Sequence, residues 1–429
     1  MAILIRGGRV IDPKNKVDKV LDVYIDQGQI KKIGRGIKKD KKTRILNAKD
    51  LWVIPGIIDM HVHLREPGRE YKEDIISGTK AAAQSGITSV ACMPNTDPPI
   101  DNISAIRFIC SRAEESGYIK VYPIGAVTKG LNGKDLAEIG SMALAGAVAI
   151  SDDGFPVMNA QLYRQAMEYA KIFNLLIIDH SEDLELSKNG QVNKGFMAAK
   201  MGLMGIPREA EYTMVARNIG LAELTGCRLH LAHLSTKESV EIVRRAKRKN
   251  KNITAETCPH YFTITEEILE NYNSLAKVKP PIRTPEDKQA IIKGLQDGTI
   301  DVIASDHAPH TREEKEMEFN RVPFGMIGME TELPLTITEL VLTKKLKPIE
   351  AVAKLTVNPA NILKLSAGTL SINAPADIAL VDIKQKKIVK NFFSKSSNSP
   401  FIGRELFGWA VTTILNGKII MHRGNLVSD

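Results

Sequence analysis

Two histidines separated by one residue, His61 and His63, end an apolar run that we expect to form a buried strand. Side chains alternate between the two faces of a strand, so both imidazoles point to one side, and Asp59 shares that side one step deeper. Buried imidazoles are costly unless their nitrogens are satisfied, and a divalent metal such as zinc satisfies them. Two hydrogen-bonded core histidines are the alternative interpretation of this stretch.

Polar residues also stand at the ends of other apolar runs. These residues are Asn95, Asp152, Asp153, Asp179, His180, His230, His233, His260, Asp306, His307 and His310. In a barrel of parallel strands, the carboxyl ends of the strands meet at one rim and form the active site, so we predict a metal site there. Side chains within the run 228–233 alternate between the two faces of the strand, so His233 and His230 point to opposite sides. We choose His233 as the ligand.

Such a site suits hydrolysis. Divalent ions held by histidine and aspartate lower the pKa of bound water to about 7 and polarise a carbonyl group. A carboxylate beside that water can act first as a base and then as an acid, and Asp306 is the natural candidate. Arg65 and Asn95 would hold an anionic substrate, because a guanidinium binds a carboxylate through two hydrogen bonds. The alternative for Arg65 is a surface salt bridge with Glu66 or Glu70.

The elements that must position these residues alternate regularly between residues 55 and 365. Short apolar runs are separated by longer amphipathic segments, such as 71–84 and 236–249, which is typical of βα units. The pattern predicts an α/β fold with a (β/α)8 TIM barrel, whose eight strands would be 57–63, 87–93, 121–127, 147–152, 175–180, 228–233, 252–257 and 301–306.

Short strands and tight turns mark both ends of the chain. Asp26-Gln27-Gly28 and Asn416-Gly417 are hairpin signals. We predict that residues 1–54 and 366–429 together build one small β-sandwich domain beside the barrel of residues 55–365. Two independent β appendages are the alternative.

Composition narrows the class of protein. The 429 residues include 43% hydrophobic and 25% charged residues, as in soluble globular proteins, and the length suits a barrel of about 250 residues with an appendage. Because no apolar run approaches about 20 residues and the start does not resemble a signal peptide, we expect a cytoplasmic protein without membrane association. The net charge is +9, but the basic runs lack interleaved aromatic residues, so we expect no nucleic-acid partner. The four scattered cysteines suggest reduced thiols.

Taken together, these stretches resemble the cyclic amidohydrolases, and among them the type I dihydroorotases, over nearly the whole chain. The most specific pieces are DMHVHLR at 59–65, CMPNTDPP at 92–99, DDG at 152–154, SDHAPH at 305–310 and PFG at 323–325. Many relatives bridge two metals with a carboxylated lysine near the end of strand four. Residues 146–154 contain no lysine, and Asp153 would supply the carboxylate instead. This departure favours the type I dihydroorotases over hydantoinases and allantoinases.

The resemblance implies reversible hydrolysis of (S)-dihydroorotate to N-carbamoyl-L-aspartate in pyrimidine biosynthesis, with one or two zinc ions per chain. His61 and His63 would bind one zinc, and His180 and His233 the other. Asp153 would bridge the two ions, and Asp306 would be both a ligand and the proton shuttle. The implied substrate-binding residues are His63, Arg65, Asn95, Lys279, His310, Phe324 and Gly325.

Two features do not follow directly from the resemblance. The family commonly has asparagine where this chain has Lys279, and lysine can donate a hydrogen bond but cannot accept one, so the contact with the substrate ring is in question. The charged segment 311–322 would be either a mobile lid that excludes water or a plain solvated loop.

Alternative functions remain at this point. One is hydrolysis of another cyclic amide of hydantoin or allantoin type, which Arg65 and Asn95 argue against. The other is a catalytically silent scaffold for aspartate transcarbamoylase, which the complete set of metal ligands argues against. We expect a homo-oligomer, and a partnership of the active enzyme with aspartate transcarbamoylase stays open.

Overall fold

A barrel of parallel strands forms the centre of the computed structural model, which describes residues 2–38 and 40–427. Its strands are hydrogen-bonded in the order β15-β14-β13-β10-β9-β8-β7-β6. They are β6 (Ile57–Val62), β7 (Ile87–Cys92), β8 (Lys120–Gly125), β9 (Ala149–Ile150), β10 (Leu176–Asp179), β13 (Arg228–Leu231), β14 (Ile253–Thr257) and β15 (Val302–Ile303). All residues of β6, β7 and β10 are buried, as expected for strands covered on both faces.

The barrel nearly closes between its first and last strands. The N–H of His63 donates to the carbonyl of His307 at 2.9 Å, and Val62 forms a parallel bridge with the same residue. The residues that follow β6 and β15 therefore lie side by side at one rim. The predicted (β/α)8 barrel is confirmed.

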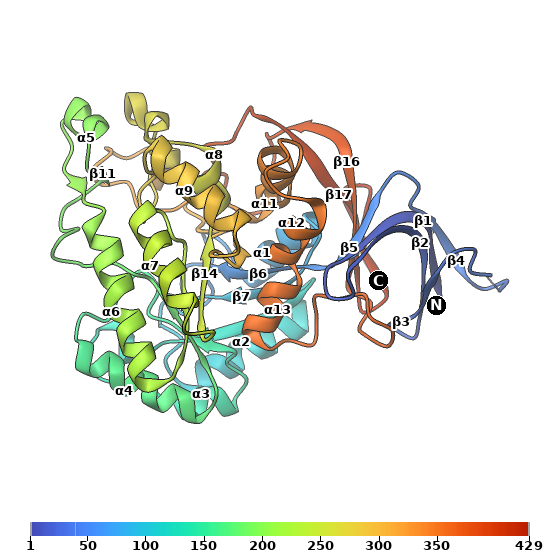
Figure 1. The fold of residues 1–429 in the computed structure, drawn as a ribbon, viewed down its shortest axis with the longest axis horizontal. Coiled ribbons are helices and arrows are strands. Elements are labelled where there is room, and N and C mark those ends of the chain that lie inside the picture. The colour runs from blue at the N-terminus through green and yellow to red at the C-terminus, as the bar shows by residue number, and fades with distance from the viewer. Residues whose placement is uncertain (1, 39, 428–429) are drawn as a thin grey trace.

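Helices surround the barrel (Figure 1). The longer ones are α1 (Ile75–Gln84), α2 (Ile103–Ser116), α4 (Ala160–Ile172), α6 (Glu209–Thr225), α7 (Lys237–Lys247), α9 (Pro285–Gln296), α11 (Met329–Thr336), α12 (Pro348–Leu355) and α13 (Val357–Leu363). Shorter helices are α3 (Ile139–Leu144), α5 (Phe196–Met201), α8 (Pro259–Thr263) and α10 (Arg312–Lys315). Capping boxes at Asp74 and Thr284 satisfy the first N–H groups of α1 and α9 and define where these helices begin.

Both ends of the chain join in a second sheet beside the barrel (Figure 1). Its strands are β1 (Ile3–Asp12), β2 (Val17–Asp26), β3 (Gln29–Gly34), β4 (Arg44–Asn47), β5 (Trp52–Pro55), β16 (Ile378–Ile388), β17 (Glu405–Leu415), β18 (Lys418–His422) and β19 (Asn425–Leu426). The two segments meet where β5 pairs antiparallel with β16, with Val53 opposite Leu380. The composite terminal unit is thus present, and the nine strands that the described residues give it belong to one continuous mixed sheet.

The hairpin turns and the core of this unit follow from its sequence. Gln27-Gly28 and Asn416-Gly417 have positive φ, as tight two-residue turns require, and they connect β2 to β3 and β17 to β18. Apolar residues from both terminal segments share one buried cluster, which includes Ile5, Val23, Val53, Leu380 and Ile414. Because each segment alone would leave this apolar surface exposed, the two segments fold together.

Candidate active site

A cavity of about 360 Å³ opens at the carboxyl ends of the barrel strands. It is lined by His63, Arg65, Asn95, Asp153, Gly154, His180, His233, Lys279, Asp306, Ala308, His310, Pro323, Phe324 and Gly325. Every site residue expected from the sequence lines this cavity except His61, which is fully buried in β6. Residues at the ends of six barrel strands and residues of the segment after β15 therefore converge on this cavity.

The carboxylate of Asp153 lies at the centre of the histidines. Its Oδ1 is 3.5 Å from a ring nitrogen of each of His61, His180 and His233. Its Oδ2 is 3.5 Å from Nε2 of His63. The Oδ1 atom of Asp306 is 3.2 Å from the same His63 nitrogen and 3.5 Å from Nε2 of His61. One carboxylate thus faces both histidine pairs, and a second faces the His61–His63 pair.

The donor set fits a metal ion. Among the described residues, the buried atoms His61 Nε2 and Asp153 Oδ1, which lie 3.5 Å apart, have no hydrogen-bond partner, although buried polar atoms normally have one. Imidazole nitrogens and carboxylate oxygens are ligands for zinc and related metals. Two groups have ligand atoms within 4.8 Å of one another, His61–His63–Asp306 and His61–Asp153–His233. The cluster can therefore bind a metal.

The outer nitrogens of three histidines have acceptors. Nδ1 of His61 is 2.6 Å from Oε1 of Glu256, and Nδ1 of His63 is 2.7 Å from Oδ1 of Asn95. Nε2 of His180 is 3.1 Å from Oε2 of Glu182. Metal-ligating histidines usually donate their second N–H to such an acceptor, which leaves the other nitrogen free to coordinate. These contacts orient three imidazoles toward Asp153.

Electrostatics keep the central carboxylates ionised. Burial alone would raise the pKa of Asp153, but the charge of His61 and the nearby ring nitrogens of His180 and His233, both 3.5 Å away, lower it well below its ordinary value. Burial opposes ionisation of Asp306 as well, yet the charge of His61 and the hydrogen bond of His63 lower its pKa. Both side chains are therefore available as anionic ligands or as proton acceptors.

Two other acidic residues of the motifs have structural roles. Asp59 accepts hydrogen bonds from the backbone N–H groups of Ser305 and His61, at 3.1 and 3.3 Å, and so ties β6 to the end of β15. Asp152 accepts from the N–H groups of Val127 and Thr128, at 2.7 and 3.1 Å. Burial raises the pKa of each carboxyl to about 6.

Three site residues have left-handed backbones, with φ of 62° at Arg65, 35° at His233 and 48° at Asp306. Residues other than glycine rarely adopt this conformation, and it costs about 1–3 kcal/mol where the surroundings enforce it. Each of them lies two or three residues beyond the end of a barrel strand. The sharp turns direct their side chains to the cavity, and such strain is typical of functional sites.

The buried guanidinium of Arg65 lies at one end of the cavity. Its Nε donates to the carbonyl of Pro309 at 3.2 Å, and burial lowers its pKa to about 10, so that it stays cationic at neutral pH. The alternative of a surface salt bridge is wrong. Glu66 instead pairs with Arg112 at 2.8 Å, and Glu70 accepts from the N–H of Gly68.

His310 lies beside Arg65, with its Nε2 3.5 Å from the guanidinium and 2.9 Å from the carbonyl of Phe324. Its Nδ1 is 3.2 Å from Glu314, which pairs with Lys72 at 2.7 Å. Burial lowers the pKa of His310 to about 3, so the ring is neutral. The single N–H of the neutral ring can be donated either to the carbonyl of Phe324 or to Glu314, and a substrate oxygen at this end could replace the carbonyl.

Lys279 lies at another part of the wall, where its Nζ is 2.9 Å from Oε1 of Glu182. Its ammonium also lies 5.4 Å from the centre of the Phe324 ring. Burial would raise the pKa of Glu182, but hydrogen bonding to His180 and the charges of His180 and Lys279 lower it to about 2. The lysine at this position therefore neutralises a buried carboxylate that orients His180.

The segment 311–322 packs against the molecule over part of its length. It contains α10, whose Lys315 is 3% exposed and donates to the carbonyls of Ser274 and Pro323 at 3.2 and 2.9 Å. Phe319 is buried in a small apolar cluster with Leu269 and other residues. This segment, called the cover below, is thus fastened at Lys315 and Phe319, while much of the rest of it is exposed.

Sequence reasoning did not identify Glu256, Glu182, Lys72 and Glu314, which support the ligands and His310. Glu256 carried a usable signal, because a carboxylate inside a buried strand requires a buried partner. His260 was noted only as a polar residue at a strand end, and Cys258 directly follows the same strand, β14. With Asp306 they form a further group whose ligand atoms lie within 4.8 Å of one another.

The chain has the fold of solved hydantoinases and dihydropyrimidinases. The whole chain superimposes on 97% of an L-hydantoinase from Arthrobacter aurescens, with a TM-score of 0.90 and 24% identity. A dihydropyrimidinase from Brevibacillus agri gives a TM-score of 0.88 at 22% identity, with 100% of this chain and 96% of that chain covered. At these identities the likeness concerns the fold.

Sequence comparisons identify the family. A family model described as Dihydro-orotase-like matches residues 51–239. A dihydroorotase from Acetivibrio thermocellus is 48% identical over 421 residues, which is 98% of this chain and 99% of the relative. A dihydroorotase from Geotalea daltonii is 49% identical over 425 residues, with 99% and 100% covered. The chain belongs to the dihydroorotase family. Within residues 2–38 and 40–427, no helix is long and apolar enough to cross a membrane.

Proposed function

We propose that this enzyme hydrolyses (S)-dihydroorotate reversibly to N-carbamoyl-L-aspartate in pyrimidine biosynthesis, with one or two zinc ions as cofactor. One observation carries the proposal: a single cavity holds both the His–Asp cluster and the buried cation Arg65. The cluster suits hydrolysis of an amide, and the guanidinium suits the carboxylate on the substrate ring. Full-length relatives at 48% and 49% identity that bear the name dihydroorotase support it.

The chain's own ligands divide into two pairs. His61 and His63 would hold one zinc ion, His180 and His233 the other, and Asp153 would bridge them. Asp306 would complete the first set, since its Oδ1 lies 3.2 Å from Nε2 of His63. Zinc bound there would polarise the ring carbonyl and lower the pKa of water.

Asp306 would move the proton. Ionised and buried, it would accept a proton from the attacking water as the C–O bond forms. It would then deliver this proton to the ring nitrogen as the C–N bond breaks, which yields the carbamoyl group and a new carboxyl group that releases the second proton of the water to solvent. In the reverse direction the same carboxylate would take the proton from nitrogen. Its fixed position beside His63 favours both transfers.

The remaining residues would orient the substrate. Arg65, Asn95 and His310 would bind the ring carboxylate. His63, whose Nδ1 contacts Asn95, would lie against the ring. Phe324 and Gly325 would close over the ring, and Lys279 would face it from the Glu182 side. Movement of the cover 311–322 would admit substrate and then exclude water.

A hydantoinase or allantoinase activity is the alternative, and the buried guanidinium of Arg65 argues against it. A silent scaffold for aspartate transcarbamoylase is disfavoured because all six candidate ligands converge. We further propose that the protein is cytoplasmic and forms a homo-oligomer. Each chain would be divided into a barrel of residues 55–365 and a terminal domain of residues 1–54 and 366–429. A complex of the active enzyme with aspartate transcarbamoylase stays compatible with this proposal.

The decisive experiment pairs metal analysis with turnover. Zinc per chain would be measured, and loss of dihydroorotate followed by ultraviolet absorbance, for the wild type, Asp306→Ala and the exposed control Asp135→Ala. We expect zinc in all three proteins, and turnover that is lost in Asp306→Ala alone. A wild type that contains zinc but does not turn over dihydroorotate would favour another cyclic amide as the substrate, or a partner protein that is required for activity. A protein that neither contains nor takes up zinc would contradict the catalytic proposal.

A further inference from the structure

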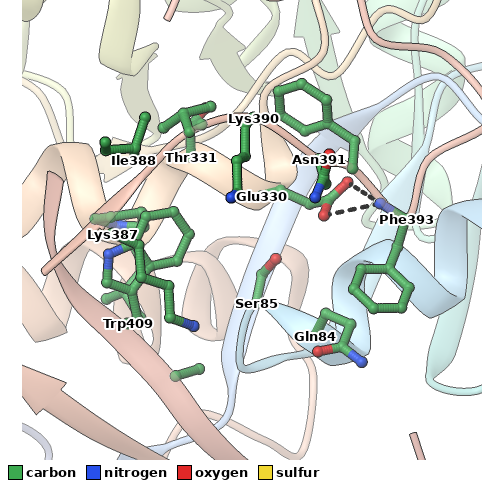
Figure 2. Close-up of a pocket in the computed structure, with 15 residues that line it drawn as sticks. Gln84, Ser85, Glu330, Thr331, Lys387, Ile388, Lys390, Asn391, Phe393 and Trp409 are labelled. Carbon is green, nitrogen blue, oxygen red and sulfur yellow. Dashed lines mark hydrogen bonds between the residues drawn. The ribbon is translucent and has the colours of Figure 1, made fainter. Parts of the chain in front are cut away.

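The connection between β16 and β17, residues 389–404, leaves the terminal sheet and lies against the barrel. Figure 2 shows how it begins: the carboxylate of Glu330, on α11, accepts the N–H of Phe393 at 2.9 and 3.0 Å. The N–H of Ser394 donates to the same carboxylate at 3.1 Å. Further on, the hydroxyl of Ser396 donates to the carbonyl of Lys72 at 2.7 Å. The connection is thus fastened to the barrel at several points.

Asn398, near the end of this connection, binds the two loops that form the carboxylate end of the cavity. Its Oδ1 accepts the backbone N–H of His310 at 3.1 Å. Its Nδ2 donates to the carbonyls of Ala308 and Gly325, both at 3.1 Å. The side chain is 3% exposed and does not line the cavity itself. All three contacts are with backbone atoms of cavity-lining residues.

The geometry requires an amide at this position. One side chain must accept one hydrogen bond and donate two, and among side chains of this length only asparagine does both. Aspartate would accept from His310 but would direct an oxygen at two carbonyl oxygens. Serine is too short to reach all three groups at once. A buried backbone group that loses its partner carries a desolvation cost, so each substitution would allow the loops to shift.

We propose that Asn398 is a positioning residue, which holds His310 and Gly325 in the arrangement that binds the substrate carboxylate and ring. The inference rests on the function proposed above. Part of the C-terminal segment would then support the substrate-binding site of the barrel, because Asn398 holds the loop at His310, which lies 88 positions earlier in the chain.

The test compares Asn398→Asp and Asn398→Ser with Asn391→Asp, a matched change at an exposed asparagine of the same connection. Zinc content, kcat and KM for dihydroorotate would be measured. We expect KM to rise about tenfold in both Asn398 variants, with kcat within about threefold and zinc unchanged, because binding of the carboxylate is lost uniformly from the ground and transition states. The Asn391 variant should resemble the wild type.

Three results separate the explanations. A wild type that binds zinc but does not hydrolyse dihydroorotate would contradict the proposed function, independently of the results with the Asn398 variants. An active wild type together with Asn398 variants of unchanged KM would overturn this inference alone, as would a fall in kcat and zinc without a change in KM. Hydrogen–deuterium exchange of the wild-type protein needs no variant: the His310 amide should exchange slowly, and exchange at the rate of a free amide would contradict the inference.

Discussion

Glu256 orients His61 through a contact of 2.6 Å between Oε1 and Nδ1, although 195 positions separate the two residues. Both side chains are fully buried, and the second oxygen of Glu256 lies 3.1 Å from Nε2 of His230. Burial would raise the pKa of Glu256, but the charge of His61 and the hydrogen bonds of both histidines lower it well below its ordinary value. An ionised acceptor holds the Nδ1–H of His61 and turns Nε2 toward Asp153 and Asp306.

Glu256→Gln should therefore weaken metal binding. Glutamine retains the shape but loses the charge that makes His61 a stronger ligand, so we expect zinc affinity to fall about 10- to 100-fold. Competition with a chelator measures the affinity, and the exposed Glu223→Gln serves as the matched control. Unchanged zinc affinity in Glu256→Gln would show that the contact does not tune the ligand.

Substitutions at Lys279 test what its ammonium does for the cavity. Lys279→Leu removes the donor and leaves Glu182 with His180 as its remaining polar partner among the contacts described above, whereas Lys279→Asn keeps a donor. We expect KM for dihydroorotate to rise about tenfold in the leucine variant and less than about threefold in the asparagine variant. Steady-state kinetics decide this, with the exposed Lys188→Leu as control. Equal KM values in both variants would exclude a donor role.

Acid stability should depend on Glu314. Burial opposes its ionisation, but hydrogen bonds with His310 and Lys72 lower its pKa from 4.5 to about 2. Because the folded-state pKa is depressed, its contribution is complete above about pH 4.5 and disappears as the pH falls through about 2. We expect Glu314→Gln to lose about 1–2 kcal/mol of unfolding free energy at pH 7 and to approach the wild type near pH 2. Denaturant titrations across this range measure it, and a constant difference would contradict the linkage.

The cover should loosen when Lys315 is replaced. Lys315→Met would leave the carbonyls of Ser274 and Pro323 without this buried donor, at a cost of about 1–3 kcal/mol in local stability. Cleavage after the glutamates of segment 311–322 by a glutamate-specific protease should become about tenfold faster. Lys249→Met, at an exposed lysine, should leave the cleavage rate unchanged. Equal rates would show that Lys315 does not hold the cover closed.

Much of the candidate site could be predicted from one sequence. In a parallel barrel every strand delivers its last residues to the same rim, so polar residues at successive strand ends must converge. This rule brings the histidines and aspartates at the strand ends together without knowledge of the tertiary structure. The resemblance to dihydroorotases then singles out the six candidate ligands His61, His63, Asp153, His180, His233 and Asp306. The eight strands and the composite terminal unit could also be recognised, because apolar periodicity and turn residues are local signals.

Tertiary structure decided which partner each of these residues has. Glu256 lies 195 positions from His61, Glu182 contacts both its neighbour His180 and the distant Lys279, and Asn398 binds a loop 88 positions away. Spacing along the chain cannot reveal such pairs, since they depend on how helices and loops pack around the rim. The sequence by itself determined the reactive groups and the rim where they meet. Only packing decided which carboxylates orient the histidines, because those contacts form when the barrel closes and the terminal segment folds against it.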